Sequence, residues 1–426
     1  MDLKYGKGRI SFEAPPNTAG VVEPAAAAVE PVESLLKKSF TSPSGQAGLS
    51  SILRKNKPGD VVVIVSDITR GIANYDKILG FLVAEMVDAG IDEKNISFVI
   101  ALGTHRKHTN EENARLYGRL CDDFDFLPHD CFRDLATVGK TSTGLEVSVN
   151  RRVQEADFVI TTGRVGFHYL AGFSGGRKAI LPGVASYDTI RNNHSKLMRE
   201  GVFVARTRGN IIAQEMSEAA ALVGVDYLLN VVETPERETA RIFCGHLEPA
   251  FNEALDYFIG ARQRPVSEPA DCVIVSAGGY PGDRDFYHTH KAMNLAMLCL
   301  RPHGSIILAG ECAEGFGNEK FLRLMRENGI DALLRYPEER IEVGGHRAFL
   351  TARILRQHQV YVLARLDHEV LRLMNFTPVQ SIEQAIDAVR KEKGDDLRTL
   401  VVPNGTAVLP ILNGANSDLS HTGGQS

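Results

Sequence analysis

The chain has 426 residues, of which 43% are hydrophobic and 24% charged, and its formal net charge is −5. This length exceeds what one simple hydrophobic core organises, so we expect two domains. The slightly acidic balance provides no overall field that would attract nucleic acid or an anionic membrane surface, so neither is an expected partner. The longest apolar runs, such as residues 61–65, are strand-sized and far short of the ~20 residues that a membrane-spanning helix needs.

The six cysteines are scattered along the chain and form no C-x-x-C pair. Their spacing argues against a disulfide framework or a thiolate zinc site and favours a reducing compartment. Residues 1–5 contain no apolar segment of the kind that an export signal needs. We therefore expect a cytoplasmic α/β protein.

The first half of the chain alternates strands and helices after an irregular start. Residues 5–12 are predicted to form one strand, and residues 14–30, rich in Ala and Pro, an extended connector. Strands rich in Val and Ile that alternate with helices favour a parallel sheet covered on both faces. The apolar patterns predict strands at 61–65, 97–102 and 157–162 and helices over 78–87 and from Thr109.

The second half repeats this alternation without repeating the sequence. It predicts a doubly wound, Rossmann-like core. The expected strands are 271–276, 305–309, 359–364 and 399–402, and the expected helices are 291–300 and 319–327.

A domain boundary is predicted near Arg264. Residues 261–270 contain two prolines and show no periodicity, as expected of a linker. We therefore expect an N-terminal mixed and parallel α/β domain over residues 1–264 and a C-terminal domain over 265–412, with the active site in the cleft between them. The tail, residues 413–426, is rich in Gly, Ser and Asn and is predicted to be disordered.

Polar clusters follow several of the predicted strands. In open parallel α/β sheets, ligands bind beyond the carboxyl ends of the strands. One such cluster would be ordinary turn chemistry, but four that each carry charged or histidine side chains favour a shared site. These clusters are residues 66–71, 103–106, 163–178 and 278–291.

The densest cluster contains a glycine pair followed by two cations. Ser174, Gly175 and Gly176 can present successive backbone N–H groups as an anion nest, with Arg177 and Lys178 adding positive charge. A plain turn explains the same residues equally well. The spacing matches neither a Walker A loop nor the dinucleotide fingerprint.

Two histidines flank this cluster. His168 precedes the glycine loop, where a loop histidine bonded to the backbone is the simpler interpretation. Ser186 is a suitable N-cap for a helix that places His194 two turns in. Taken alone, His194 would be a surface or half-buried helical histidine.

Together these segments resemble the nickel-dependent lactate racemase family. The order His168, Lys178, His194, with spacings of ten and sixteen residues, carries the resemblance most specifically. The resemblance extends over essentially the whole chain except the tail. It also includes residues 67–70 (DITR), 103–106 (GTHR), 5–7 (YGK), 278–281 (GGYP) with Lys291 downstream, 344–348 (GGHRA) and 352–353 (AR).

The resemblance implies a cofactor, a nickel-pincer nucleotide, which is a pyridinium mononucleotide with two sulfur-containing arms. His194 would complete the nickel coordination, since imidazole and soft sulfur donors suit Ni(II) in a planar arrangement. Lys178 would be the covalent attachment point. Asp67 would lie on the cofactor side, where it orients Arg70 or a histidine or only caps a turn. The nucleotide phosphate would be held by Ser174, Gly175, Gly176 and Arg177.

The implied reaction is racemisation or epimerisation at C2 of a 2-hydroxy acid. It would proceed by proton-coupled hydride transfer through a 2-keto acid intermediate, with His105 and His168 as the acid/base pair for the two enantiomers. Arg70 and Lys291 would bind the substrate carboxylate.

The sequence departs from the family pattern near Lys291. His288 stands where the lactate enzymes have glutamine, and we expect it to contact substrate. It could accept a substrate hydroxyl, bind a second carboxylate when protonated, or leave small substrates unaffected. Lactate, longer 2-hydroxy acids, malate-like diacids and sugar acids all stay open as substrates.

Two other functions compete with the racemase hypothesis. A nicotinamide-dependent 2-hydroxy acid oxidoreductase would use the same cations and histidines, but no G-x-G-x-x-G follows the first strand of either half. A non-catalytic carrier of the nickel nucleotide would not need both His105 and His168. Nothing in the chain resembles a sulfur-insertion enzyme, so we expect separate biosynthetic proteins to supply the cofactor.

Overall fold

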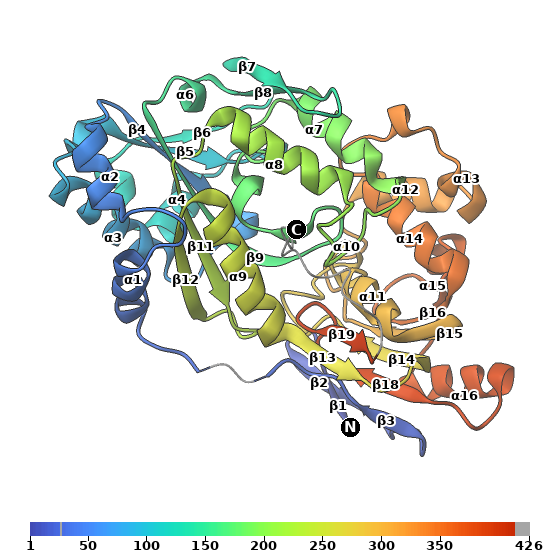
Figure 1. The fold of residues 1–426 in the computed structure, drawn as a ribbon. Coiled ribbons are helices and arrows are strands. Elements are labelled where there is room, and N and C mark those ends of the chain that lie inside the picture. Colours follow the sequence, from blue (N-terminus) through green and yellow to red (C-terminus); the bar gives the residue numbers. More distant parts are fainter. Residues whose placement is uncertain (26–27, 414–426) are drawn as a thin grey trace. The chain divides into compact units, whose positions relative to one another are not determined.

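The computed structural model describes residues 1–25 and 28–413 and falls into two compact units (Figure 1). The N-terminal unit consists of Ala26–Lys196 and Glu200–Gly260. The C-terminal unit consists of Met1–Ala25, Leu197–Arg199 and the described chain from Ala261 onward. Each unit has its own sheet and core and is described by itself. No helix within the described ranges is long and apolar enough to cross a membrane.

The N-terminal unit is built on a seven-stranded sheet in the order β12-β11-β9-β4-β5-β6, with β10 paired to β9. All neighbours are parallel except β12 and β10, which pair antiparallel. The chain runs outward from β4 through β5 to β6 and then returns to the other side of β4, so the strand order reverses between β4 and β9. The strands are β4 (Val61–Ser66), β5 (Ile96–Ala101), β6 (Phe126–Pro128), β9 (Phe158–His168), β10 (Gly172–Ser174), β11 (Tyr227–Glu233) and β12 (Thr239–Gly245).

Both faces of this sheet are covered. Alternate residues of β4, such as Val61 and Val63, pack with Leu35, Leu79 and other apolar side chains of α1 (Val32–Thr41), α2 (Leu49–Asn56) and α3 (Tyr75–Asp88). The short turn η3 (Gly176–Ala179) packs against β4, β9, β11 and the helix α8 (Ile211–Val223). The other elements of this unit are η1 (Ile68–Arg70), α4 (Asn110–Tyr117), α5 (Leu120–Asp123), β7 (Leu135–Lys140), β8 (Glu146–Asn150), α6 (Arg151–Gln154), α7 (Tyr187–His194) and α9 (Leu247–Arg262).

The C-terminal unit is built on a six-stranded parallel sheet in the order β17-β16-β15-β14-β18-β3. The strand order reverses between β14 and β18, as expected of a doubly wound core. The strands are β3 (Thr18–Val21), β14 (Ala270–Ser276), β15 (Leu300–Ala309), β16 (Gln359–Leu363), β17 (Thr377–Pro378) and β18 (Thr399–Val402).

Helices cover this second sheet too. Ile382, Ile386 and Val389 of α16 (Ile382–Lys393) pack with Ile274 and Ile307 of the sheet. The helices α11 (Lys291–Ala296) and α14 (His346–Gln357) contact β15. The remaining helices are α10 (Phe286–Thr289), α12 (Glu319–Glu327), α13 (Ile330–Leu334) and α15 (His368–Leu373). The mixed α/β fold with parallel sheets predicted from the sequence is therefore confirmed.

The start of the chain corrects two predictions. Residues 5–12 do not form one strand but the hairpin of β1 (Asp2–Tyr5) and β2 (Gly8–Ser11), because Gly6 adopts a φ of 55° and turns the chain. The expected connector contains β3, which pairs in parallel with β18. The first 25 residues thus belong to the C-terminal unit, whereas a single boundary near Arg264 would have left them in the N-terminal domain.

The predicted linker and two element lengths also differ. Helix α9 continues to Arg262, and β13 (Gln263–Val266) pairs with β19 (Leu409–Leu412), so the proline-containing segment is ordered by a partner far along the chain. The helix expected over 291–300 ends at Ala296, and β15 begins at Leu300. The predicted disordered tail lies, from residue 414 onward, outside the described residues.

Candidate active site

The end of β4 is fixed by two buried tyrosines that the sequence did not single out. The Ser66 backbone N–H donates to Tyr75 Oη at 2.9 Å, and Tyr117 Oη donates to the Ser66 carbonyl at 2.9 Å. Both tyrosine side chains are fully enclosed. The residue that follows, Asp67, therefore leaves the strand in a fixed direction at the point where the strand order reverses.

Asp67 and His105 form a hydrogen-bonded pair. Asp67 is buried and accepts from His105 Nδ1, and Thr69 Oγ1 donates to Asp67 Oδ1 at 2.9 Å. Burial alone would raise the pKa of Asp67, but the hydrogen bond and charge of His105, with Arg70 and Thr69, outweigh it and hold that pKa below its ordinary value. Because a carboxylate only accepts, the His105 proton sits on Nδ1 and Nε2 is the basic atom. The His105 side chain is 44% exposed, so Nε2 is accessible to a ligand.

Arg70 is the last residue of the turn η1 and is exposed. The start of the turn is anchored by His108, whose Nε2 accepts the Ile68 backbone N–H at 3.0 Å. His108 Nδ1 is 2.9 Å from the amide oxygen of Asn113. With both nitrogens used in this way, His108 positions the turn that presents Arg70.

Lys178 carries a buried amine without a hydrogen-bond partner among the described residues. Its Nζ atom is enclosed, and burial lowers the pKa of Lys178 well below its ordinary value, with the charges of Arg70 and Arg177 adding to the effect. Burial therefore favours the uncharged form of the amine, which is its nucleophilic form. This electrostatic coupling also places Lys178 in the same neighbourhood as the Asp67–Arg70 turn.

The neighbouring Arg177 is buried against an aromatic ring. Its guanidinium lies 4.8 Å from the centroid of Phe251, and burial lowers the pKa of Arg177 to about 10, with Glu248 opposing that shift. It remains cationic at neutral pH. The predicted positive charge beside Lys178 is thus present, inside the protein rather than at its surface.

The glycine pair is more tightly packed than an open anion nest. The Gly176 N–H donates to Asn230 Oδ1 at 3.1 Å, and Ser174 Oγ donates to the Arg164 carbonyl at 2.8 Å. A Cβ at Gly175 would lie 2.7 Å from Asn230 Oδ1, which explains why glycine is needed there. The nest therefore has one backbone donor fewer to offer a phosphate than the sequence predicted. Asn230, buried on β11, was not foreseen.

His168 is the last residue of β9 and is buried. Its Nδ1 accepts the backbone N–H groups of Leu170 at 3.2 Å and Ala171 at 3.1 Å, as the simpler sequence interpretation anticipated. The neutral ring consequently carries its proton on Nε2. The ring also stacks on Tyr169, with centroids 4.7 Å apart.

His194 is the last residue of α7 and is buried. The predicted N-cap is confirmed, since Ser186 Oγ accepts the Thr189 backbone N–H at 3.1 Å.

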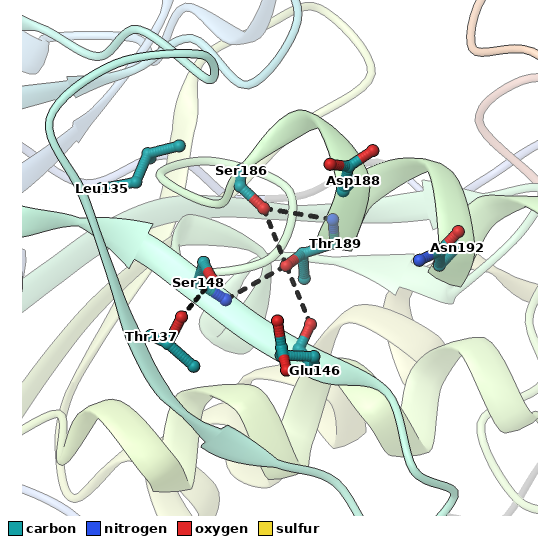
Figure 2. A pocket seen from close by; sticks show the side chains of 8 residues that line it. All are labelled: Leu135, Thr137, Glu146, Ser148, Ser186, Asp188, Thr189 and Asn192. Carbon is teal, nitrogen blue, oxygen red and sulfur yellow. Dashed lines mark hydrogen bonds between the residues drawn. The ribbon is translucent and has the colours of Figure 1, made fainter.

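Beyond the cap, Ser186 and Thr189 contact β8, and Figure 2 shows them in a pocket on this side of α7. This pocket contains none of the predicted catalytic residues; it is lined by Leu135, Thr137, Glu146, Ser148, Ser186, Asp188, Thr189 and Asn192.

The end of α7 is held by Glu215 of α8, which the sequence analysis missed. This fully buried carboxylate accepts from Asn193 Nδ2 at 2.8 Å and from the Lys196 ammonium and the Thr143 hydroxyl. Two of its partners, Asn193 and Lys196, therefore lie one residue before and two residues after His194. The signal in the sequence was an acidic residue on the apolar stripe of a helix.

In the C-terminal unit, the N-terminal hairpin packs on the loop that follows β14. Gly6 donates its N–H to Asp283 Oδ2 at 2.6 Å and accepts from the Tyr280 N–H at 2.8 Å. The Lys7 ammonium lies over the Tyr280 ring at 5.4 Å. The first residues of the chain thus shape the loop at the reversal of the second sheet.

This loop leads into α10, which carries His288, and α11, which begins at Lys291 three residues later. His288 Nδ1 is 2.8 Å from Asp285 Oδ1, and its Nε2 is 3.0 Å from Arg284 Nη2. Burial lowers the pKa of His288, although Asp285 acts in the opposite direction and Lys291 reinforces the lowering. This lowering favours the neutral ring and disfavours a protonated His288 as a ligand for a carboxylate, while its contact with substrate stays a prediction. Next to it, His290 is buried and stacked on Phe321 as a core residue.

The predicted residues thus fall into two sets. Within the N-terminal unit, hydrogen bonds and charge coupling connect Asp67, His105, Arg70, Lys178 and Arg177. His168 and His194 are buried in the same unit. His288 and Lys291 belong to the C-terminal unit. The shared site predicted from the sequence stays a prediction.

Comparisons with known proteins identify relatives over nearly the whole chain. The lactate racemase N-terminal domain matches residues 5–203, and the lactate racemase C-terminal domain matches residues 266–410. The lactate racemase of Thermoanaerobacterium thermosaccharolyticum is 29% identical over 96% of this chain and 98% of its own, and that of Lactiplantibacillus plantarum is 28% identical over 96% and 99%.

Solved structures agree with these matches. The lactate racemase apoprotein from Thermoanaerobacterium thermosaccharolyticum superposes with a TM-score of 0.89 at 28% identity, covering 96% of this chain and 99% of that one. A Thermotoga maritima protein, 18% identical, shares the fold with a TM-score of 0.62 over 87% of this chain and 100% of its own. Two matched domains that together span most of the chain show that it belongs to the lactate racemase family, a family of isomerases.

Proposed function

We propose that this enzyme inverts C2 of a 2-hydroxy acid, lactate or a larger or more polar relative, with a nickel-pincer nucleotide as cofactor. The observation that carries the proposal is the Lys178 amine, which is buried and has no hydrogen-bond partner among the described residues, and whose pKa is lowered by burial and by Arg70. A folded protein does not keep a buried amine without compensation unless something else uses it. A covalently attached cofactor is such a use.

The residues around Lys178 fit such a group. The uncharged amine would form an amide or thioamide by attacking an activated carbonyl or thiocarbonyl carbon, which releases its leaving group while the nitrogen loses a proton, and Arg177 would supply positive charge for a phosphate. The buried imidazole of His194, steadied by the Glu215 contacts to Asn193 and Lys196, would complete the coordination of nickel. When bound, the nucleotide supplies an acceptor that takes the C2 hydrogen with its electron pair and returns it.

The protein's own groups manage the proton and the carboxylate. His105 Nε2 takes the hydroxyl proton of one enantiomer while Asp67 stabilises the resulting imidazolium through Nδ1. His168 would serve the other enantiomer, whose hydroxyl is presented from the opposite side: its Nε2–H can donate a proton to the oxygen at C2, whereas taking a proton there requires the other tautomer, with Nδ1 released from the Leu170 and Ala171 N–H groups. Arg70 pairs with the substrate carboxylate through its guanidinium fork, and Lys291 provides a second cation. The planar 2-keto acid is the intermediate between the two enantiomers.

The test uses the protein loaded with cofactor by its separate biosynthetic proteins. One enantiomer of a 2-hydroxy acid, incubated without nicotinamide, should give a mixture of both enantiomers on chiral chromatography. The same preparation should contain nickel and a mass increment on the peptide that carries Lys178. Turnover that depends on added NAD would favour an oxidoreductase instead, and a nickel-loaded protein that inverts none of the tested acids would favour a carrier.

A further inference from the structure

Arg284 lies in the loop that follows β14, just before the helices α10 and α11 that carry His288 and Lys291. Its Nη2 donates to His288 Nε2 at 3.0 Å, and its Nε donates to Asp285 Oδ2 at 3.2 Å. Asp285 itself is nearly buried and caps α10 by accepting the His288 backbone N–H at 2.8 Å. The guanidinium is thus held along one edge by residues that are themselves fixed.

The opposite edge of the guanidinium is open. Across residues 1–25 and 28–413, no other atom hydrogen-bonds the Arg284 guanidinium, so its Nη1 group and the second Nη2 hydrogen remain available. The side chain is 41% exposed. Two parallel N–H groups in one plane match the two oxygens of a carboxylate.

His288 determines the direction in which this fork is presented. Its ring accepts from Arg284 through Nε2 because Nδ1 donates to Asp285, so the neutral imidazole acts as a spacer between a carboxylate and a guanidinium. A protonated ring could not accept that hydrogen bond and would repel the cation. His288 therefore acts by positioning Arg284.

Two cations, Arg284 and Lys291, thus act on the neutral ring. Arg284 donates a hydrogen bond to it, and Lys291 opens α11 three residues after His288 and acts on it through its charge. Asp285 compensates one of these charges, so the cluster keeps a net charge of about +1 that favours anions. One cation suffices for the carboxylate at C1, which leaves the fork for a second anionic group.

We propose that Arg284 is a specificity-determining residue that binds the distal carboxylate of a 2-hydroxy dicarboxylate, with His288 and Asp285 as its positioning residues. This inference rests on the proposed racemase function and names the substrate class of the same site. A 2-hydroxy acid with an uncharged tail gains nothing from the fork. The enzyme should consequently prefer malate to 2-hydroxybutyrate, which has the same number of carbons and no second carboxylate.

The test compares these two acids, with lactate as a third, in chiral-chromatography assays of the loaded enzyme. In the wild type, kcat/KM should be higher for malate than for 2-hydroxybutyrate. Arg284→Gln should lower kcat/KM for malate about 10- to 100-fold, mainly through KM, because the lost contact binds ground state and transition state alike. The same variant should change lactate kinetics less than about threefold. Arg284→Lys, which keeps the charge but loses the fork, should lie between the two.

Arg301→Gln is the matched control. Arg301 is similarly exposed, at 46%, belongs to the same unit and forms one ion pair with Asp271 away from this loop. It should leave all three acids unaffected. An equal loss for malate and lactate in Arg284→Gln would reduce Arg284 to a structural residue and overturn the proposal. Inversion of lactate without preference for malate would overturn this inference alone, whereas inversion of neither acid would overturn the proposed function as well.

Discussion

At the scale of single residues, the site depends on groups whose protonation is set by their surroundings. Asp67 stays ionised although it is buried, because His105 and Thr69 donate to it. The Lys178 amine has no hydrogen-bond partner in the described part of the chain, and burial lowers the pKa of Lys178 and so favours the uncharged form. The protein environment thus favours the charged form of the carboxylate and the uncharged form of the nearby amine.

Replacing the carboxylate that orients His105 should impair catalysis without removing the cofactor. Asp67→Asn keeps the shape but loses the charge, so the imidazolium formed on His105 is no longer stabilised. We expect kcat/KM to fall by about 100-fold or more, with nickel content and the Lys178 mass increment unchanged. Steady-state kinetics on the loaded variant measure this effect, and unchanged kcat/KM would exclude Asp67 from the machinery.

The same variant should change how stability depends on pH. The folded-state pKa of Asp67 lies below its ordinary value, so this group stabilises the fold above the ordinary carboxylate pKa. That contribution disappears as the pH falls through the folded-state pKa. Urea unfolding should therefore show the wild type more stable than Asp67→Asn at pH 7, and the difference should shrink below about pH 4. A difference that does not vary with pH would contradict this charge assignment.

Two lysines with largely enclosed side chains should respond oppositely to the same replacement. Lys178→Met removes an amine without a hydrogen-bond partner in the described chain and should stabilise the cofactor-free protein by about 1 kcal/mol. Lys196→Met leaves the fully buried Glu215 without its cation and should destabilise it by about 3 kcal/mol. Chemical denaturation of both variants measures the two changes in the free energy of unfolding. If Lys178→Met were as destabilising as Lys196→Met, the amine would have a structural partner and the tether would lose its support.

At the scale of elements, the position of His194 depends on how α7 is fastened at both ends. Ser186 caps its start, and Glu215 of α8 holds Asn193 and Lys196 at its end. These contacts are polar and buried, so they allow one geometry and lose much of their energy when one partner is removed. A metal ligand on a short helix gains its precision from such support.

Weakening this support should loosen α7 before it affects the sheet. Glu215→Gln loses the charged contact to Lys196, and we expect amide hydrogen exchange over residues 187–196 to accelerate while exchange in β4 and β9 stays slow. Nickel should also dissociate faster from the loaded protein. The control is Glu218→Gln on the same helix, because Glu218 binds Ser142 and Gln214 and, within the described chain, forms no hydrogen bond or ion pair with α7. Equal acceleration in both variants would mean that Glu215 does not position the helix.

At the scale of the whole molecule, both units use the same principle. Each has a mostly parallel sheet whose strand order reverses next to its first central strand, and the predicted residues follow the strand ends at that reversal. Asp67 follows β4 and the Gly278–Lys291 segment follows β14. A sheet order of this kind brings loops that are distant in sequence to one edge, as for the clusters at the ends of β4, β5 and β9, whereas the fourth cluster follows β14 of the other sheet and a site shared by all four stays a prediction.

The sequence predicted the parts of this architecture that depend on local pattern. β18 and α12 have the predicted bounds, and Ser186 caps α7 as expected, because apolar periodicity and capping are properties of neighbouring residues. The pairing of β3 with β18, the contact of Asn230 with Gly176 and the Glu215 contacts join residues far apart in the chain. No short-range pattern encodes such contacts, so they became visible only in the folded protein.

The central claim is that the C2 hydrogen leaves with its electron pair and returns without mixing with solvent. The direct measurement is inversion of a single enantiomer of a 2-hydroxy acid deuterated at C2, in ordinary water and without added nicotinamide, followed by mass spectrometry of the separated enantiomers. The account predicts that the inverted product retains deuterium at C2, because His105 and His168 move only the hydroxyl proton. An inverted product that carries solvent hydrogen at C2 would instead assign the histidines to proton abstraction from carbon and contradict the account.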